Sequence, residues 1–394
     1  MTRDTAQDLR KRAFSFVLTM GIVNLFADIT YEGGGSLNGP FLGFLGAGAA
    51  LISIVAGFGE FLGYAIRLPA GYIGDRTGKL WLLTFIGYLI NLLAVPAMAL
   101  AGNWQTAALF LILERAGRAI RKPTVESMLS YTTGTLGKGW VYGLNTALDE
   151  TGATLGPLLM ALVLWLKGPE SYSTAYAWLL VPSLLAIACV GIARFEFPDP
   201  KSLDTSTPPE SSAFSRAYWL SMAGGACLAA GLLSFEFVSF HLLKSHTVTP
   251  PWIPFLLSIA TLFGIGASLG FGKAYDRHGI PVVLLAIVLS AAGPPLLFFG
   301  GFYGALGGMI LWGLGYATQD TLLKAIVAGL LPRGRRNVAF GLFYTGYGSG
   351  WLIGSIVAGL LYDKSITAVV IFAVASQLAA LPLLAMAARN PEAH

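Results

Sequence analysis

Long apolar runs broken by short polar segments limit most strongly what this chain can fold into. Of the 394 residues, 55% are hydrophobic and only 11% are charged, whereas ordinary soluble domains carry about 25% charged residues. A soluble protein of this length needs a polar surface around roughly two or three domains, and this chain has too few charges to provide one. The composition excludes a soluble enzyme, a disordered chain and a coiled coil, and it predicts an integral membrane protein.

The apolar runs indicate helices rather than the strands of a membrane barrel. They are long and rich in Gly, Ala and Leu, whereas barrel strands alternate in hydrophobicity over about ten residues. A helix satisfies its own backbone groups in lipid, and it needs about 20 residues to cross the bilayer. We expect twelve membrane-spanning helices, at residues 13–36, 42–73, 79–101, 104–130, 140–166, 173–195, 215–244, 252–275, 280–300, 302–331, 337–361 and 365–388.

The longest polar stretch divides the chain near its middle. Residues 197–215 are rich in Pro and Ser, a composition that is typical of a linker. We therefore expect an all-α integral membrane fold of two pseudo-symmetric six-helix bundles, the first over residues 1–196 and the second over residues 216–394.

The loop charges predict the orientation in the membrane. Most basic residues fall at alternate helix ends, while the opposite ends hold only Lys167, Lys244 and Lys364. Cytoplasmic loops carry such an excess of Lys and Arg, so we expect both termini and the linker in the cytoplasm and the chain in the inner (cytoplasmic) cell membrane. The same asymmetry accounts for the net charge of +5, so no nucleic-acid partner is indicated.

Two patterns recur between the halves at nearly the same offset. Residues 71–78 and 272–279 both have the form G-x-x-x-D-R-x-G and lie 201 residues apart. Three glycines in the fifth predicted helix have the same spacing as three in the eleventh, 198 residues later: Gly143, Gly152 and Gly156 against Gly341, Gly350 and Gly354. The two repeats indicate parallel halves related by an axis along the membrane normal, as in many secondary transporters.

These features resemble the major facilitator superfamily over essentially the whole chain. The segment after the second helix looks like that family's loop signature, although Leu80 stands where a second base is usual. The resemblance implies that the loop is a conformational latch whose acid lies near the cytoplasmic start of the eleventh helix; a tight turn with a solvated Asp-Arg pair is the simpler alternative. The implied latch residues are Gly71, Gly74, Asp75, Arg76, Gly78 and Lys79, with Asp276 and Arg277 in the second half.

The fifth helix resembles the glycine signature of proton antiporters in the same family. Gly143, Gly152, Gly156 and Pro157 match it, but its final glycine pair is missing. Simple close packing of helices is the alternative. Leu111 and Arg115 resemble the family's helix-four arginine motif, and residues 27–32 and 114–123 resemble a group of prokaryotic exporter-like members without an assigned substrate.

Charges inside membrane helices point to function, because each costs about 2.5–3.5 kcal/mol at the bilayer centre. In the first helix Asn24, Asp28 and Glu32 share a face, with Tyr31 close to it. The first helix lines the central cavity in the family that the chain resembles. Asp28 and Glu32 are therefore candidates for binding a proton or substrate, and a buried acid satisfied by a neighbouring helix is the alternative for each.

Other charges lie in the second, fourth and fifth helices. Glu60 is either a proton site or the partner of an arginine such as Arg115 or Arg118. Glu114 and Arg115 lie near the middle of the fourth helix, and an arginine beside a carboxylate lowers its pKa, which would couple proton release to helix movement. Asp149 is either a coupling acid or another arginine's partner.

The second half has fewer charges. Glu236 lies in the seventh helix. The tenth helix has an aromatic and polar face suited to an organic ligand by stacking or cation–π contact, although Asp320 and Lys324 would also make an intrahelical pair. That face consists of Trp312, Tyr316, Gln319 and Asp320.

Motifs that the sequence lacks exclude some energy sources and cofactors. It has no Gly-rich P-loop, and four histidines with two scattered cysteines make no metal site. We predict no enzyme activity and no cofactor, and we expect the proton gradient to be the energy source. The leading hypothesis is a monomeric proton-coupled antiporter that exports a small organic solute, cationic or amphipathic, by alternating access. The alternatives are a nutrient or metabolite symporter and a non-transporting membrane sensor or lipid scramblase.

Overall fold

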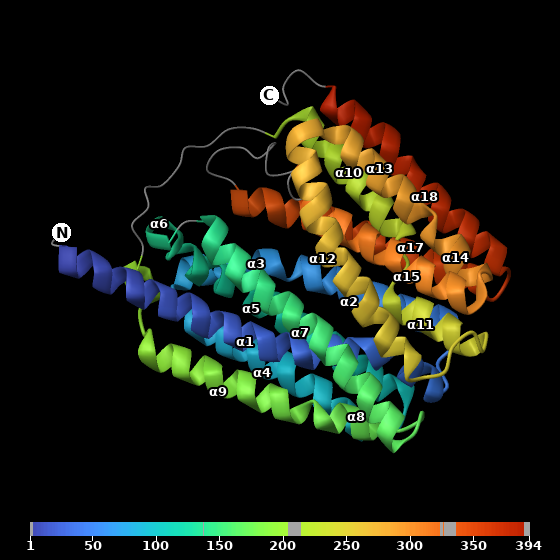
Figure 1. Ribbon diagram of the computed structural model, residues 1–394, viewed down its shortest axis with the longest axis horizontal. Helices are drawn as coiled ribbons and strands as arrows, with labels where there is room; N and C mark the ends of the chain where they lie inside the picture. The colour runs from blue at the N-terminus through green and yellow to red at the C-terminus, as the bar shows by residue number, and fades with distance from the viewer. Residues whose placement is uncertain (1–2, 137, 204–213, 324–325, 327–335, 390–394) are drawn as a thin grey trace.

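Helices make up all the regular structure in the part of the chain that the computed structural model describes, residues 3–136, 138–203, 214–323, 326 and 336–389. Figure 1 shows them as a bundle of long, roughly parallel rods, with the N-terminal half on one side and the C-terminal half on the other. This arrangement confirms the predicted all-α membrane fold.

The described part of the N-terminal half forms ten helical segments. They are α1 (Arg3–Phe44), α2 (Ala49–Ala65), α3 (Arg67–Thr77), α4 (Leu80–Ala97), η1 (Met98–Leu100), α5 (Trp104–Ser130), α6 (Thr133–Leu136), α7 (Lys138–Lys167), α8 (Tyr172–Trp178) and α9 (Leu180–Glu196). The remaining described segments are η2 (Pro200–Leu203), α10 (Arg216–Gly231), α11 (Phe235–Lys244), α12 (Trp252–His278), α13 (Ile280–Ala291), α14 (Gly293–Phe299), α15 (Gly301–Ala317), the π-helical η3 (Thr318–Leu323), α17 (Arg336–Tyr362) and α18 (Ile366–Ala388).

Within the described residues, nine helical stretches are long and apolar enough to cross a membrane. The long helix α5 falls outside this set, and the charges of Glu114, Arg115, Arg118 and Arg121 along it lower its hydropathy. It nevertheless packs against α4 and α2 inside the bundle. The number of membrane-spanning helices, twelve, stays a prediction.

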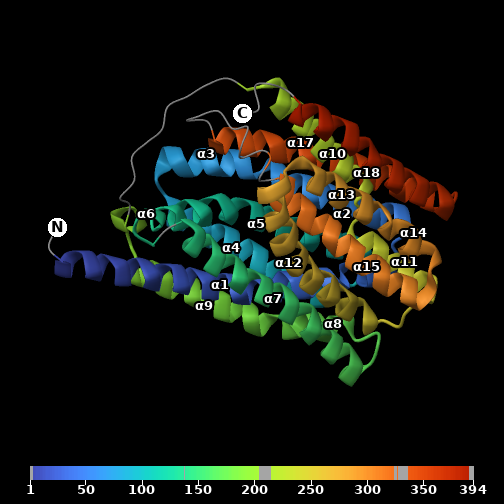
Figure 2. The same cartoon turned by 45° about the horizontal axis from the view of Figure 1, so that its top comes forward.

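The first two helices differ from their predicted bounds. Helix α1 runs over 42 residues, Arg3–Phe44, with Pro40 inside it, instead of ending at residue 36. At 1.5 Å per residue it is about 63 Å long, and its N-terminal end projects beyond the bundle (Figure 2). The chain then turns at Gly46, whose φ of 90° suits a residue without a side chain, so the second helix begins at Ala49 rather than at residue 42.

The seventh predicted helix, 215–244, is broken into α10 and α11. Ser234 caps α11, because its Oγ accepts a hydrogen bond from the Phe237 N–H at 3.3 Å. Two side chains from other helices satisfy carbonyls at the break: Gln377 Nε2 donates to Gly231 O at 3.0 Å, and Trp312 Nε1 donates to Leu233 O at 2.7 Å. These long-range donors stabilise a gap that local propensity does not predict.

The repeated glycines allow the same helix pair to pack closely in each half. Gly152 and Gly156 of α7 lie against the backbone of α1, and a Cβ atom added at Gly156 would lie 2.8 Å from Gly33 N. Gly350 and Gly354 of α17 lie in the same way against the backbone of α10. The repeat seen in the sequence therefore corresponds to a repeated helix contact.

The two halves touch mainly along three helix pairs, α2 with α17, α7 with α12, and α1 with α11, and to a smaller extent between α2 and α11, α1 and α12, and α3 and α17. Ser53 Oγ of α2 donates to Ser355 O of α17 at 2.6 Å. Further along the same pair, the rings of Tyr64 and Tyr344 stack with centroids 5.4 Å apart. Apolar clusters fill the interior of each half, around Tyr88 in the first and Tyr347 in the second.

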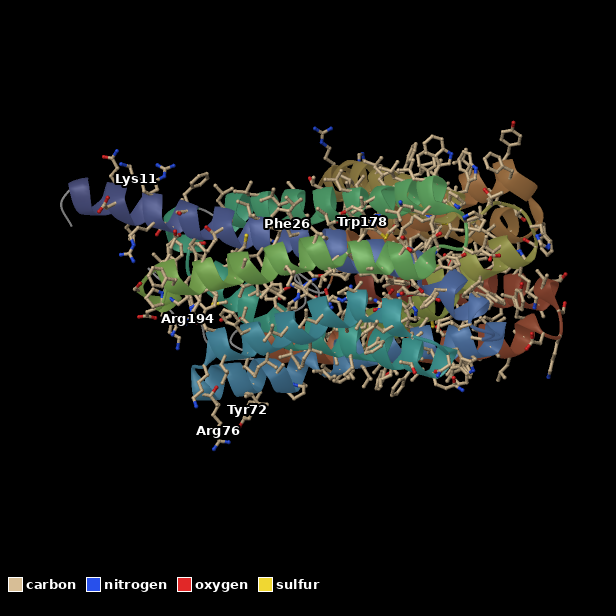
Figure 3. All side chains as sticks on the ribbon, turned by 90° about the horizontal axis from the view of Figure 1, so that it is seen from below. Lys11, Phe26, Tyr72, Arg76, Trp178 and Arg194 are labelled. Atoms are coloured by element: carbon tan, nitrogen blue, oxygen red, sulfur yellow. The ribbon has the colours of Figure 1, made fainter. Side chains whose placement is uncertain are left out.

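Basic residues from helices far apart in sequence lie at one end of the molecule. Figure 3 shows Lys11 of α1, Arg76 of α3 and Arg194 of α9 toward the same end of the bundle. This common location agrees with the alternating loop charges of the sequence, and it leaves the cytoplasmic assignment of that end as a prediction.

Candidate functional site

Arg115, near the middle of α5, is surrounded by carboxylates from three helices. Its guanidinium pairs with Glu60 of α2, with the neighbouring Glu114 (Nε to Oε2, 3.3 Å) and with Glu236 of α11 (2.9 Å). The four side chains are 6–18% exposed. Since α5 and α11 belong to different halves, the Arg115–Glu236 ion pair joins the halves directly.

Arg118, one turn further along α5, extends these ion pairs toward a more open edge. Its Nε lies 3.3 Å from Glu114 Oε1, and its Nη1 lies 3.9 Å from Glu32 Oε1. The guanidinium also lies over the Tyr31 ring at 4.7 Å. The Glu32 side chain is 33% exposed, the most exposed of the group. We call Glu32, Glu60, Glu114, Arg115, Arg118 and Glu236 the central cluster.

Asn91 of α4 connects the central cluster to a third arginine. Its Nδ2 donates to Glu114 Oε1 at 3.0 Å, and its Oδ1 accepts from Arg121 Nε at 3.3 Å. Arg121 in turn lies over the Tyr88 ring at 4.4 Å. The sequence analysis did not select Asn91 or Tyr88, because a single polar residue in an apolar helix does not reveal its partner on another helix.

A chain of hydrogen bonds continues from Tyr88 into the contact between α1 and α7. The Tyr88 hydroxyl donates to Asn24 Oδ1 at 2.7 Å, Asn24 Nδ2 donates to Asn145 Oδ1 at 2.9 Å, and Asn145 Nδ2 donates to Asp149 Oδ2 at 3.1 Å. The other oxygen of Asp149, Oδ1, is buried without a hydrogen-bond partner among the described residues.

Asp28 lies on the same contact and is 6% exposed. A Cβ atom added at Gly152 would lie 2.8 Å from Asp28 Cβ, so the glycine makes room for the acid. Asp28 is close enough to Asp149 for the two carboxylates to interact, and the Tyr31 hydroxyl is within hydrogen-bonding range of Asp28. We call Asp28 and Asp149 the seam acids.

The structure gives partners to several of the acids selected from the sequence. Glu60 forms an ion pair with Arg115, as the pairing alternative expects, and its role as a proton site stays a prediction. Glu236 joins the same cluster, although its partner could not be predicted. Asp149 accepts a hydrogen bond from Asn145, and its coupling role stays a prediction.

The predicted ligand-binding face of the tenth helix is only partly described. Trp312 and Tyr316 stack with centroids 5.5 Å apart, but the Trp312 N–H is used at the break in the seventh helix. Tyr316 is 41% exposed. The side chains of Gln319 and Asp320 lie outside the described residues.

The latch loop has the backbone that its glycines predict. Gly78 and Gly279 end the two copies of the motif with φ of 65° and 68°, a region that favours glycine. A Cβ atom added at Gly74 would lie 3.4 Å from the Thr124 side chain of α5, so α3 packs closely there. Arg76 and Arg277 are exposed, while Gly143 and the side chains of Asp75 and Asp276 lie outside the described residues.

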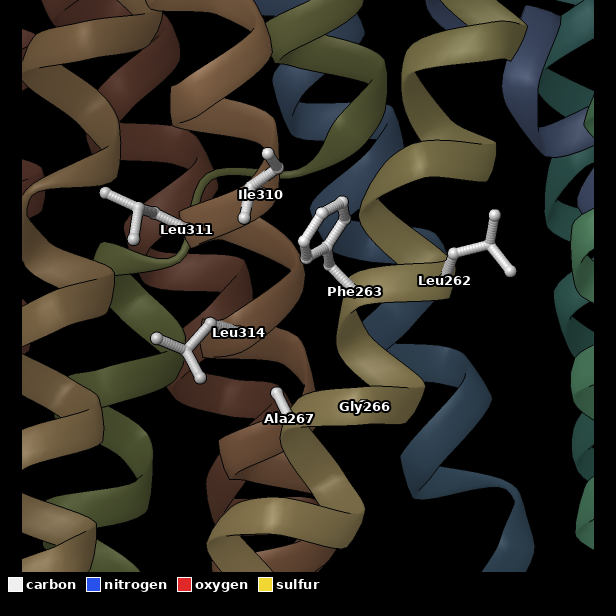
Figure 4. Close-up of a pocket in the computed structure, with 7 residues that line it drawn as sticks. All are labelled: Leu262, Phe263, Gly266, Ala267, Ile310, Leu311 and Leu314. Carbon is white, nitrogen blue, oxygen red and sulfur yellow. The ribbon is translucent and has the colours of Figure 1, made fainter.

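An apolar pocket of about 520 Å³ lies between α12 and α15. Figure 4 shows residues such as Phe263 and Leu311 around it. Its walls carry no charged side chain among the described residues, so the pocket cannot compensate a buried ion. The candidate functional site is therefore the central cluster with the seam acids.

A helical membrane protein built from two repeated halves has an architecture that many secondary transporters share. A family model described as "Major Facilitator Superfamily" matches residues 220–394. An uncharacterised MFS-type transporter of Methanocaldococcus jannaschii, MJ1317, is 26% identical over 330 residues, 82% of each chain. The chain belongs to the major facilitator superfamily, whose members are transporters and not enzymes.

Other comparisons cover either most of the chain or a part of it. The uncharacterised protein Rv2265 of Mycobacterium tuberculosis is 31% identical over 379 residues, 94% of this chain and 92% of the relative. The multidrug resistance protein MdtG of Salmonella choleraesuis is 32% identical over 129 residues, 30% of each chain.

Among solved structures, the nucleoside transporter NupG and the peptide transporter POT in complex with sulfate have the same fold. Their TM-scores are 0.70 and 0.74 at 14% and 15% identity. The matches cover 94% of this chain and 98% of NupG, and 95% of this chain and 93% of POT. At this identity they establish the fold alone.

Proposed function

We propose that this protein is a proton-coupled antiporter that exports a small organic cation, or a cationic amphipathic solute, across the inner (cytoplasmic) membrane. It works by alternating access, as a monomer, with both termini in the cytoplasm and with the proton gradient as its energy source. The observation that carries the proposal is the buried Arg115–Glu236 ion pair between the halves.

This ion pair makes movement of the halves depend on charge. Protonation of Glu236, or a cation that competes with Arg115 for it, removes the attraction that joins α5 to α11. A buried charge separated from its partner is costly, so the halves separate favourably only when the carboxylate is neutralised in another way. A proton and a cationic solute can each do this, and they exclude one another at the same oxygen atoms.

Two features support export over uptake. The relative MdtG, which matches 30% of the chain, is named as a multidrug resistance protein. The glycines Gly152 and Gly156, with Pro157, resemble the antiporter signature of the family. With competition between proton and solute, an inward proton gradient drives the solute outward.

Proton release on ligand binding tests the proposal. Purified protein in weakly buffered detergent solution is mixed with a panel of lipophilic cations and metabolites, and a pH indicator records released protons. We expect a cation to release protons from the wild type and a smaller release from Glu236→Gln, which removes the carboxylate paired with Arg115. Glu170→Gln, at the exposed loop between α7 and α8, is the control and should match the wild type.

Two results would contradict the proposal. A ligand that binds without moving protons would mean that the buried acids are structural ion pairs. A ligand that takes up protons as it binds, and moves with them in the same direction in proteoliposomes, would establish symport.

A further inference from the structure

The central cluster contains more acids than bases. Its carboxylates come from α1, α2, α5 and α11 and its guanidiniums from α5 alone: Glu32, Glu60, Glu114 and Glu236 against Arg115 and Arg118. Arg115 is shared by three of the carboxylates, so none of them has a guanidinium to itself. If all six groups are ionised, the cluster carries two surplus negative charges.

Neighbouring groups do not remove this surplus. Arg121 is the base that faces Asp28, and Lys122 with Arg121 faces Asp149. Glu126 adds a third acid close to Asp149. Among the described residues, these two bases lie opposite three acids, so this neighbouring group has no spare positive charge. Within the part of the chain that the structure describes, the surplus of two negative charges therefore belongs to the central cluster.

Such a surplus is unstable inside a membrane. Each uncompensated charge at the bilayer centre costs about 2.5–3.5 kcal/mol on insertion scales. Whatever occupies the cluster in its stable states must supply two positive charges, either as protons on two carboxylates or as charges on a bound solute. Exchange between these occupants then moves no net charge.

Glu32 is the carboxylate best placed to receive a solute. Its side chain is 33% exposed and its 3.9 Å contact with Arg118 is the longest ion pair of the cluster. The Tyr31 ring beside it already faces a guanidinium, and an aromatic face of this kind also attracts ammonium groups. The open edge of the cluster thus combines an accessible carboxylate with an aromatic wall.

We infer, on the basis of the proposed function, that the solute is an organic dication, such as a bis-ammonium or bis-amidinium compound, which exchanges for two protons. On the cytoplasmic side two carboxyl O–H bonds break, both protons leave to water, and the two cationic groups take their place. On the opposite side two protons rebind and the dication leaves. Glu32 holds one of the two cationic groups.

The test counts protons with a matched pair of probes. Decamethonium is a dication with an apolar spacer, and decyltrimethylammonium is the corresponding monocation. Isothermal titration in buffers of different ionisation enthalpy gives the protons released per probe bound. In proteoliposomes, the rate at which decamethonium is exchanged for protons is measured at equal internal and external pH, with and without a potassium diffusion potential.

We expect two protons released per decamethonium bound, and an exchange rate that the potential leaves unchanged. Glu32→Gln should release one proton per decamethonium and bind it at least about tenfold more weakly, because one charge pair with the probe is lost. Glu32→Asp keeps the charge and should still release two. Glu170→Gln should behave as the wild type, which controls for effects of purification.

The outcomes separate this inference from the proposed function. Release of one proton, or tighter binding of the monocation than of the dication, would overturn the inference that the solute is a dication, while the proposal of proton-coupled antiport would stand. Exchange that responds to the membrane potential would overturn the two-for-one balance. Binding of either probe without proton release would overturn both proposals.

Discussion

At the scale of single residues, Arg115 organises the site. One guanidinium contacts Glu60, Glu114 and Glu236, and its five N–H donors in a rigid fork suit several carboxylates at once. The periodicity of each helix predicts which acids share a face, and it allowed Arg115 as the partner of Glu60. It could not predict Glu236 as a partner, since that contact depends on how the two halves dock.

Removal of the Arg115 charge should strongly destabilise the protein. Arg115→Met leaves three buried carboxylates without their shared partner, and loss of one member of a buried ion pair typically costs about 3–5 kcal/mol. We expect a clearly lower midpoint of thermal unfolding in detergent. Arg12→Met, at an exposed position of α1, is the control. Equal midpoints for Arg115→Met and the wild type would show that the carboxylates are neutral.

At the scale of helices, the glycine pattern predicted close helix packing correctly. The prediction of one unbroken seventh helix over residues 215–244 was wrong. Gly152 and Gly156 lie against α1, as expected for small residues at membrane helix contacts. The break between α10 and α11 depends on Trp312 and Gln377, which are distant in sequence. Local sequence patterns predict which face of a helix packs against a neighbour. A break that side chains of other helices stabilise can be predicted only from the tertiary structure.

A methyl group at Gly156 should separate α1 from α7. Gly156→Ala places a Cβ atom 2.8 Å from Gly33 N, and overpacking of this kind costs about 1–3 kcal/mol. We expect lower thermal stability and slower exchange. Gly191→Ala in α9 meets nothing within 4 Å and serves as the control. If both variants match the wild type, the α1–α7 contact is looser than the structure indicates.

The break in the seventh helix should depend on the indole N–H of Trp312. Trp312→Phe keeps a ring and removes the donor to Leu233 O, and an unsatisfied buried carbonyl costs about 1–3 kcal/mol. The expected result is a lower unfolding midpoint and faster hydrogen exchange in α11. Trp178→Phe, at a half-exposed position, tests for a general effect of losing an indole. A Trp312→Phe variant with unchanged exchange in α11 would argue against this role.

At the scale of the whole molecule, the two halves are joined by α2 with α17, by α7 with α12, and by the central cluster between them. Ser53–Ser355 and Tyr64–Tyr344 are neutral contacts, whereas Arg115–Glu236 is a contact that a proton or a cation can break. The charge-poor sequence predicted a membrane protein of two halves. It could not predict the ion pair between them, to which we assign the connection between ligand binding and movement.

The most direct test of this account is transport of the proton-releasing solute into inside-out vesicles with an imposed pH gradient. With the lumen acidic, we predict that the wild type accumulates the solute against its gradient and that dissipation of the pH gradient stops accumulation. Glu236→Gln removes the titratable charge from the Arg115–Glu236 ion pair. This variant should still exchange solute downhill but lose the response to pH. Accumulation driven by an alkaline lumen, or an unchanged pH response in Glu236→Gln, would contradict proton-coupled antiport at this site.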